Sequence, residues 1–336
     1  MRFEINASKA RGARRGPFAL LCALAGALTG CDAHTGEPPV LAREVLLYEH
    51  QPERVRQGAL RFEAGFVLAS ADPAFGGFSG LWIAPDGREL VTVSDHGTIW
   101  RATLEHAGDR LVGLSDWRST RLGPLAVDAG SRIDVEALAA DANGDFMIAV
   151  ESQEPLRRVA QGDPAQPMRP LLAEGQLSEA GAAAGNAGIE ALTSLSDGSL
   201  LAFSEGIFDT PDRLAAWRIS AVEGQIQRLG YAVSEGFVPT GADWLDRAIY
   251  VVERRFALIG GGFVTRLMVF DAAQLDADVP IQGRELARLA WPSLAENFEG
   301  IAVRPGASRR VLLYLISDDN FLPVQRTLLL QFSLAP

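Results

Sequence analysis

The sequence predicts an all-β fold assembled from one short unit that recurs five times along the chain. Each unit contains a short strand, a turn with Asp, Asn or Gly, and a second, apolar strand. The units start 57, 54, 52 and 57 residues apart, counted at Leu81, Leu138, Leu192, Trp244 and Ile301. Two further extended runs follow most units, and helical periodicity is nearly absent. Because about 55 residues hold four strands, each unit is one blade, and we predict a single five-bladed β-propeller.

The fifth unit has only three strands, of which the last is expected at residues 326–334. The segment at 60–69 (LRFEAGFVLA) is expected to supply the missing strand and to close the ring, which removes exposed sheet edges. Six blades are the alternative, if residues 45–56 begin another blade. An open β-sandwich, or two small β-domains, fits the regular spacing less well. The large aromatic side chains of the units, among them Trp100, Trp217 and Trp291, are predicted to pack between blades.

The first 30 residues are expected to form a lipoprotein signal peptide. Five basic residues and one acidic residue precede an apolar run at 18–28. Eleven residues rise only ~16 Å as a helix, too short to cross a ~30 Å hydrocarbon core, as in secretory signals. The run ends in LTGC, which resembles the bacterial lipobox, in which the cysteine is acylated. We therefore expect Cys31 to anchor the chain in a lipid bilayer; an ordinary cleaved signal is the alternative.

The remaining domain boundaries follow from this anchor. Residues 31–44 are expected to hold the lipidated cysteine and a linker, and residues 45–336 the propeller. The mature protein is then expected at the bacterial cell envelope, facing the periplasm, with inner and outer membrane both open. The 31 basic and 42 acidic residues give a formal net charge of −11, which argues against a nucleic-acid partner. Two cysteines exclude a disulfide scaffold, and a monomer is expected.

Polar residues recur at two places in each unit. The entry to the first strand carries Glu136, Glu190, Asp243 and Glu299, with Ser79 in the first unit. The end of the second strand carries Asp95, Glu151, Glu205, Glu253 and the cluster Asp318-Asp319-Asn320. Blades are related by rotation, and antiparallel neighbours place the start of one strand beside the end of the next. Both sets are therefore predicted to converge on one mouth of the central channel.

So many carboxylates at one mouth predict a bound cation. Like charges ~4 Å apart repel by ~4 kcal/mol at an effective dielectric constant of 20, so either several acids are protonated or a cation lies among them. Oxygen ligands favour Ca²⁺ over zinc, and the four histidines lack HxxxH spacing. The simpler alternative is that single acids cap turns or bind backbone amides. The candidate metal ligands are Asp95, Glu136, Glu190, Asp243, Glu299, Asp318 and Asp319.

The same mouth supplies candidates for chemistry. An arginine fork binds phosphate or carboxylate bidentately, and a carboxylate can act as a general base. For Arg254 and Arg255 the alternative role is an internal ion pair. For His96 the alternative is a surface or turn position without a catalytic role. The candidate catalytic residues are Glu151, Glu205, Glu253, Arg254 and His96. The candidate substrate-binding residues are Arg254, Arg255 and Asn320.

Several segments resemble the phytase-like family of bacterial envelope proteins described as having "esterase-like activity of phytase". The resemblance extends from about Phe66 to the C-terminus, and its most specific parts are VVERRF and SDDNF…QRTLLLQF. The other segments that carry it are GGFSGLWIAPDGREL…VSDHG, RIDVEALAADANGDFMIAVES, GIEALTSLSDGSLLAFSEG and ENFEGIAVRPG. The resemblance implies a β-propeller related to calcium-dependent phytases, with a small phosphate or carboxylic ester as substrate.

The resemblance also assigns residues to the family motifs. Glu136, Glu190 and Glu299 match its first-strand acids. Its strand-end motifs correspond to Asp95, Glu205, Glu253-Arg254 and Asp318-Asp319-Asn320. The fourth unit departs from the pattern, with Asp243 in Thr-Gly-Ala-Asp where the family has a Ser-Glu pair, and Ala137 and Ala191 replace the usual glycine. Two other functions stay open, a calcium-stabilised propeller that only binds a ligand and a sugar lactonase similar to the gluconolactonase propellers.

Overall fold

The structure is a computed structural model that describes residues 38–125, 133–141, 144–152, 154–181, 187–220, 224–257 and 262–335. The chain divides into Met1–Gly36 and a second unit, Glu37–Pro336. The predicted signal peptide and the predicted lipidation site Cys31 lie outside the described residues. Among the residues described, none of the helices is both long enough and apolar enough to cross a lipid bilayer.

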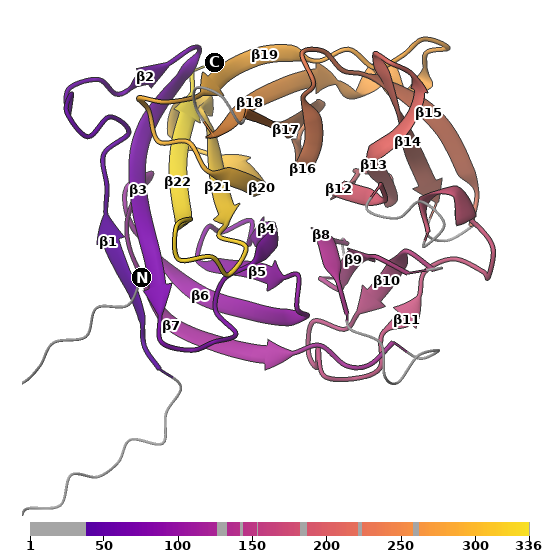
Figure 1. Ribbon diagram of the computed structural model, residues 1–336, viewed down its shortest axis with the longest axis horizontal. Helices are drawn as coiled ribbons and strands as arrows, with labels where there is room; N and C mark the ends of the chain where they lie inside the picture. Colours follow the sequence, from indigo (N-terminus) through magenta and orange to yellow (C-terminus); the bar gives the residue numbers. More distant parts are fainter. Residues whose placement is uncertain are drawn as a thin grey trace, which may run out of the picture. The chain divides into compact units, whose positions relative to one another are not determined.

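Five antiparallel sheets surround a central axis, which confirms the five-bladed propeller (Figure 1). Blade one consists of β4 (Phe78–Ile83), β5 (Glu89–Ser94), β6 (Thr98–Ala107) and β7 (Arg110–Arg121). Blade two consists of β8 (Val135–Ala140), β9 (Phe146–Val150), β10 (Leu156–Val159) and β11 (Arg169–Pro170). Blade three consists of β12 (Ile189–Ser194), β13 (Ser199–Thr210), β14 (Arg213–Ser220) and β15 (Ile226–Ala232). Blade four consists of β16 (Val238–Leu245), β17 (Ala248–Ala257), β18 (Gly262–Asp271) and β19 (Arg284–Leu289).

Blade five combines strands from both ends of the described chain. It contains β20 (Asn297–Pro305), β21 (Val311–Asp318), β22 (Thr327–Leu334) and β3 (Leu60–Ser70), with β3 antiparallel to β22. Both β1 (Val40–Glu44) and β2 (Arg56–Gln57) pair with β3. Residues 45–56 therefore begin no sixth blade, and the sheet starts at Val40, five residues before the expected domain start.

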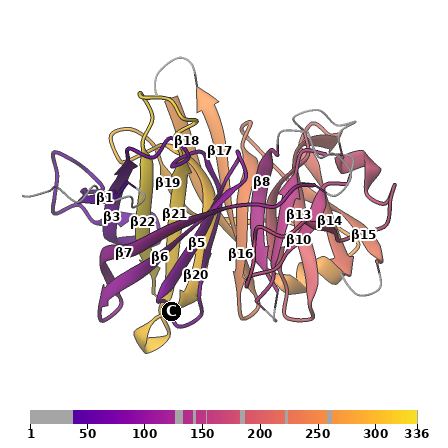
Figure 2. The same cartoon turned by 90° about the horizontal axis from the view of Figure 1, so that it is seen from below.

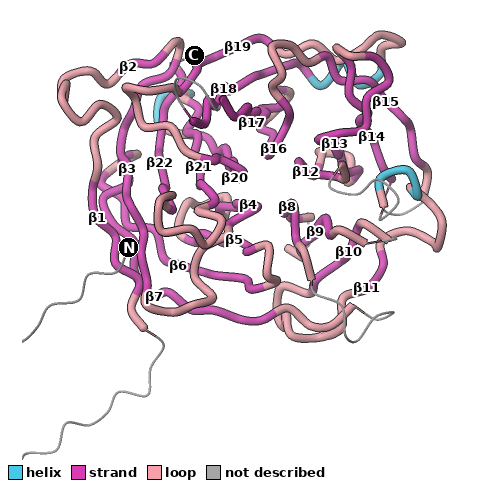
Figure 3. The backbone as a smooth tube through the Cα atoms, in the orientation of Figure 1, coloured by secondary structure: helices cyan, strands magenta, loops and turns pink. Residues whose placement is uncertain are grey.

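Among the residues that the structure describes, helical structure is limited to short 3₁₀ turns, shown in cyan in Figure 3. These turns are η1 (Ser178–Ala180), η3 (Ala272–Asp276) and η4 (Ala307–Arg309). The first strands β4, β8, β12, β16 and β20 lie nearest the axis (Figure 1). The outer strands follow them in chain order in blades one to four, whereas in blade five the N-terminal strand β3 lies outside β22. Figure 2 shows the same blades from the side. The groups that reach one mouth of the central channel therefore come from the start of each first strand and from the adjacent part of each second strand.

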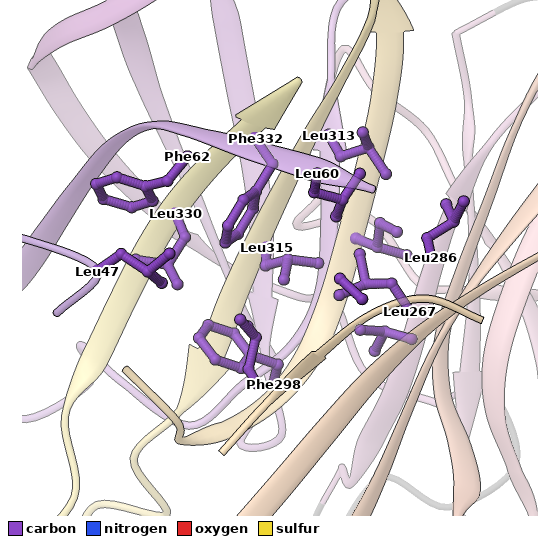
Figure 4. Packing of buried hydrophobic residues seen from close by; sticks show 14 of the residues in the cluster. Leu47, Leu60, Phe62, Leu267, Leu286, Phe298, Leu313, Leu315, Leu330 and Phe332 are labelled. Atoms are coloured by element: carbon purple, nitrogen blue, oxygen red, sulfur yellow. The ribbon is translucent and has the colours of Figure 1, made fainter. Parts of the chain in front are cut away.

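The hydrophobic core lies between neighbouring blades. Figure 4 shows one such cluster, in which Leu267 and Leu286 of blade four pack with Phe298, Leu315 and Phe332 of blade five. Burial of this apolar area, at roughly 25 cal/mol per Å², holds the blades together.

The predicted packing of the tryptophans is only partly correct. Trp100 and Trp217 are buried, as predicted. Trp291 is 80% exposed, so its predicted packing between blades is wrong. It lies in the link after β19, outside the strands that face a neighbouring blade.

All five first strands share one irregularity near their entry. The pairing of the first with the second strand skips one residue in every blade, between Phe78 and Gly80 in blade one and between Pro239 and Gly241 in blade four. The skipped residues are Ser79, Glu136, Glu190, Thr240 and Glu299. A small residue follows each of them because the next blade is close: a Cβ on Gly241 would lie 2.5 Å from the Glu299 carbonyl oxygen.

Candidate functional site

An acidic cavity of about 280 Å³ lies at one mouth of the channel. Groups from all five blades line it, and we call it the acidic bowl. The described residues that line it supply eight carboxyl groups and one guanidinium, from Asp95, Asp134, Glu136, Glu151, Glu190, Glu205, Glu299, Asp318 and Arg254. Below the bowl, the space on the axis between Leu81, Leu138, Leu192 and Ile301 is only about 10 Å³. This is room for no more than about one water molecule. A ligand must therefore enter and leave by the mouth.

The bulged residue of each first strand supplies the lower part of the bowl. Glu136, Glu190 and Glu299 line the cavity together with Ser79 of blade one. In blade four the equivalent residue is Thr240, whose hydroxyl donates to the Phe298 carbonyl oxygen at 2.8 Å. Three of the four predicted first-strand acids thus meet at the axis.

Asp243, the fourth predicted first-strand acid, lies elsewhere. It is three residues beyond the bulge of β16 and lines a different cavity, of about 410 Å³. Its carboxylate accepts the backbone N–H of Val303 at 2.7 Å and of Trp244 at 2.8 Å. Burial raises the pKa of Asp243 to about 7 against these hydrogen bonds. Asp243 therefore joins blades four and five rather than contributing to the acidic bowl. The prediction was wrong because it aligned unit four with the other units out of register.

The upper part of the bowl comes from the place in each blade where the pairing of the second strand with the first strand ends. The residues that line it are Asp95, Glu151, Glu205, Arg254 and Asp318, one from each blade. In blade four the position belongs to Arg254 and not to Glu253. Successive residues of a strand face opposite sides. Glu253 therefore turns away, and its buried carboxylate accepts hydrogen bonds from Tyr231 Oη at 2.6 Å and from the side chain of Arg266.

Arg254 is the only cation among the described residues that line the bowl. Its Nη1 donates to Asn297 Oδ1 at 2.7 Å, and its Nη2 lies 3.4 Å from Glu299 Oε1 and 3.6 Å from Glu205 Oε1. Its Nε is buried and has no hydrogen-bond partner among the described residues. Burial alone lowers the pKa of Arg254, but the surrounding carboxylates outweigh burial and raise it. The guanidinium is held firmly and keeps its charge.

The acids of the bowl crowd one another strongly. Burial, and then the charges of Asp134 and Glu151, raise the pKa of Glu136 to about 8. Burial likewise raises the pKa of Glu299 to about 8, although Arg254 opposes the change. Burial also raises the pKa of Asp318 to about 6, against a backbone hydrogen bond from Asn320. Without a further positive charge, the bowl favours protonated carboxyl groups at neutral pH.

One part of the bowl has the geometry of a cation site. Single carboxylate oxygens of Asp134, Glu136 and Glu151 lie within 4.8 Å of one another. Oxygen donors at this spacing fit a hard divalent ion, and Ca²⁺, which takes six to eight oxygens, can complete its shell with water. The sequence interpretation missed Asp134, although it stands two residues before Glu136, at the entry to β8. Glu151, predicted as catalytic, belongs to this cluster.

The remaining predicted site residues lie at or beyond the rim. His96 stacks on Phe321 with ring centroids 4.4 Å apart, and its Nε2 is 3.8 Å from Asp95 Oδ1. Arg255 lies over the ring of Phe237 and donates to the Glu235 carbonyl oxygen at 3.2 Å. Neither His96 nor Arg255 lines the bowl.

Of the last residue of β21 and the two that follow it, two line the bowl and one does not. Asp318 and Asn320 line the bowl. Asp319 instead accepts the backbone N–H groups of Gly77 and Phe321, each at 3.0 Å, and the Thr327 hydroxyl at 2.9 Å. Its carboxylate holds the loop after β21 in place.

Comparison with solved structures finds matches of low sequence identity. A gluconolactonase from Xanthomonas campestris is 12% identical, with a TM-score of 0.44 over 89% of this chain and 99% of that chain. A virginiamycin B lyase from Staphylococcus aureus is 11% identical, with a TM-score of 0.38 over 80% and 72%. The Kuenenia stuttgartiensis hydrazine synthase is 13% identical, with a TM-score of 0.37, and the match spans 74% of this chain and only 58% of that one. No curated protein sequence matches the chain.

The family of the chain follows from a different comparison. The model of the phytase-like family, described as "Esterase-like activity of phytase", matches residues 73–321. This range contains every residue of the acidic bowl. The chain belongs to the phytase-like family.

Proposed function

We propose that this member of the phytase-like family is a calcium-dependent hydrolase of phosphate or carboxylic esters. The observation that carries the proposal is the juxtaposition, in one bowl, of the Asp134–Glu136–Glu151 oxygen cluster and the guanidinium of Arg254. The cluster supports a divalent cation, and the arginine supports an anionic or polarised oxygen of a substrate. Neither feature alone distinguishes an enzyme from a binding protein.

The residues of the bowl divide the work of hydrolysis between them. Arg254 binds and orients the ester oxygen that gains negative charge, because its position is fixed by Asn297 and Glu299. Glu205 is partly exposed, and its Oε1 lies 3.6 Å from Arg254 Nη2, which supports a role for this carboxylate in accepting a proton from the attacking water. A calcium ion, when bound, supplies Lewis-acid polarisation and counter-charge. Water adds to the carbonyl carbon or phosphorus, the ester C–O or P–O bond breaks, and the alcohol leaves with a proton.

The setting of the enzyme rests on the sequence alone. The LTGC segment supports acylation of Cys31, and acylation would tether the propeller to the bacterial envelope on the periplasmic side. We propose that it acts there as a monomer on a small-molecule substrate and has no nucleic-acid partner. The acidic bowl itself would repel a phosphate backbone.

Removal of calcium tests the proposal. We expect dialysis against EDTA to abolish hydrolysis of phosphate monoesters and short acyl esters, and to lower Tm by at least ~5 °C, because ligand binding stabilises the native state. Added Ca²⁺ should restore both, whereas added Mg²⁺, which demands stricter octahedral geometry, should restore less.

A substrate panel should include nucleotides, sugar phosphates, acyl esters and lactones. Activity that survives chelation would remove the metal from the mechanism. Tight calcium binding without turnover of any class would identify a binding module.

A further inference from the structure

Three exposed apolar side chains follow residues of the acidic bowl along the chain, one near the end of β17 and two in the loop after β21. Phe256 is 58% exposed, Leu322 is 48% exposed and Val324 is 85% exposed. Phe256 lies two residues after Arg254, and Leu322 and Val324 lie four and six residues after Asp318, so all three follow residues that line the bowl. We call these three residues the apolar crest. Figure 2 shows strands β17 and β18 and the loop between β21 and β22 reaching the same side of the propeller.

Phe256 has a fixed relation to Arg254. The two residues are separated by one position on β17 and therefore face the same side of the sheet. Across the hairpin, Arg254 pairs with Thr265 and Phe256 pairs with Phe263. The rings of Phe256 and Phe263 are 5.0 Å apart at an angle of 60°. An aromatic pair therefore stands directly beyond the guanidinium that we propose to bind the substrate.

Charge and size restrict what the bowl accepts. Eight carboxyl groups face one guanidinium in about 280 Å³, counting only the lining residues that the structure describes. The eight carboxyl groups outnumber the three positive charges that Arg254 and one divalent ion supply together. A ring carrying many phosphates needs several cations and more room, whereas one carbonyl or one singly charged head group needs only Arg254 and the metal cluster.

We propose that the substrate is an ester with one carbonyl or singly anionic head and an apolar acyl group that binds to the apolar crest. This inference rests on the proposed hydrolase function and adds the class of substrate. The head occupies the bowl between Arg254 and the Asp134–Glu136–Glu151 cluster. The apolar group leaves by the mouth, since the passage below is closed, and contacts Phe256 first.

A chain-length series tests the inference. With Ca²⁺ present, kcat/KM for 4-nitrophenyl acetate, butyrate and hexanoate should rise about twofold per added methylene, as expected for methylenes that are only partly buried. Phe256→Ser should flatten this series, with acetate changed less than about twofold and calcium affinity unchanged. The control Val279→Ser, at another strongly exposed apolar residue far from the bowl in sequence, should leave the series intact. An unaltered slope in Phe256→Ser, or a preference for inositol hexakisphosphate over the monoesters, would overturn the inference. The inference would also be overturned if Phe256→Ser reduced binding to zwitterionic lipid vesicles but left the dependence of kcat/KM on acyl-chain length unchanged.

A binding measurement separates this inference from the proposed function. If no ester is hydrolysed, the hydrolase proposal fails, and hexanoate binding to the calcium-loaded protein then tests the crest by calorimetry. Weakening of hexanoate binding at least fivefold by Phe256→Ser would support the crest as an apolar subsite. Equal binding by wild type and variant, or no binding to wild type, would overturn it.

Discussion

Replacement of Arg254 by alanine is expected to lower kcat/KM for the best ester substrate by about 10²–10³-fold, the usual cost of removing one donor to a developing oxyanion. The reason is that no other cation lines the bowl in the part of the chain that the structure describes. Calcium affinity should not fall, because the substitution removes a positive charge beside the carboxylates. Arg254→Lys should recover only part of the activity, since an ammonium group lacks the planar fork.

Arg255 offers a matched control for this experiment. It has the same chemistry and is the next residue in the chain, but it contacts Glu235 and Phe237 rather than the bowl. Arg255→Ala should therefore keep kcat/KM within about threefold of wild type. Equal losses in the two variants would show that the effect of Arg254 does not come from its place in the bowl.

Glu136→Gln is expected to weaken calcium binding by at least ~10–100-fold while it stabilises the metal-free protein. The substitution removes one of three oxygens that lie within 4.8 Å of one another, which accounts for the loss of affinity. It also removes a buried carboxyl group whose pKa is raised to about 8, first by burial and then by neighbouring acids. Keeping such a group protonated at neutral pH costs folding free energy that a neutral glutamine does not. Isothermal calorimetry measures the first effect, and thermal melts with EDTA and with calcium measure the second.

The opposite signs of these two effects make the prediction specific. Tm of Glu136→Gln should exceed that of wild type in EDTA and fall below it in calcium. Glu53→Gln, at an exposed acid outside the bowl, should change neither quantity appreciably. A Glu136→Gln variant that is less stable than wild type in EDTA would mean that the carboxylate has a structural role instead.

The fold could be predicted because the repeat is regular and its strands are short. The blade count and the chain position of most strands followed from the spacing of the apolar runs and turns. Burial of Trp291 was predicted from residue type alone and was wrong, because the residue lies in a link between blades. The proline that follows it, Pro292, is a sequence signal for the end of the strand, and the prediction did not use it.

The site was harder to predict, because one-residue offsets change which side chain faces the axis. Counting from apolar anchors aligned Asp243 with the first-strand acids, whereas the bulge in β16 places Thr240 there. Alternation along β17 likewise gives the strand-end position to Arg254 and turns Glu253 into the space between blades. Asp134 was overlooked because it precedes the strand, and only the fold brings it beside Glu151.

The position of calcium in a crystal tests the central claim most directly. In crystals soaked with Ca²⁺, the anomalous difference map should show a peak in the bowl, with carboxylate oxygens of Asp134, Glu136 and Glu151 about 2.3–2.6 Å from it. A bowl that stays without a peak at millimolar calcium, or an ion bound only outside these three residues, would contradict the account.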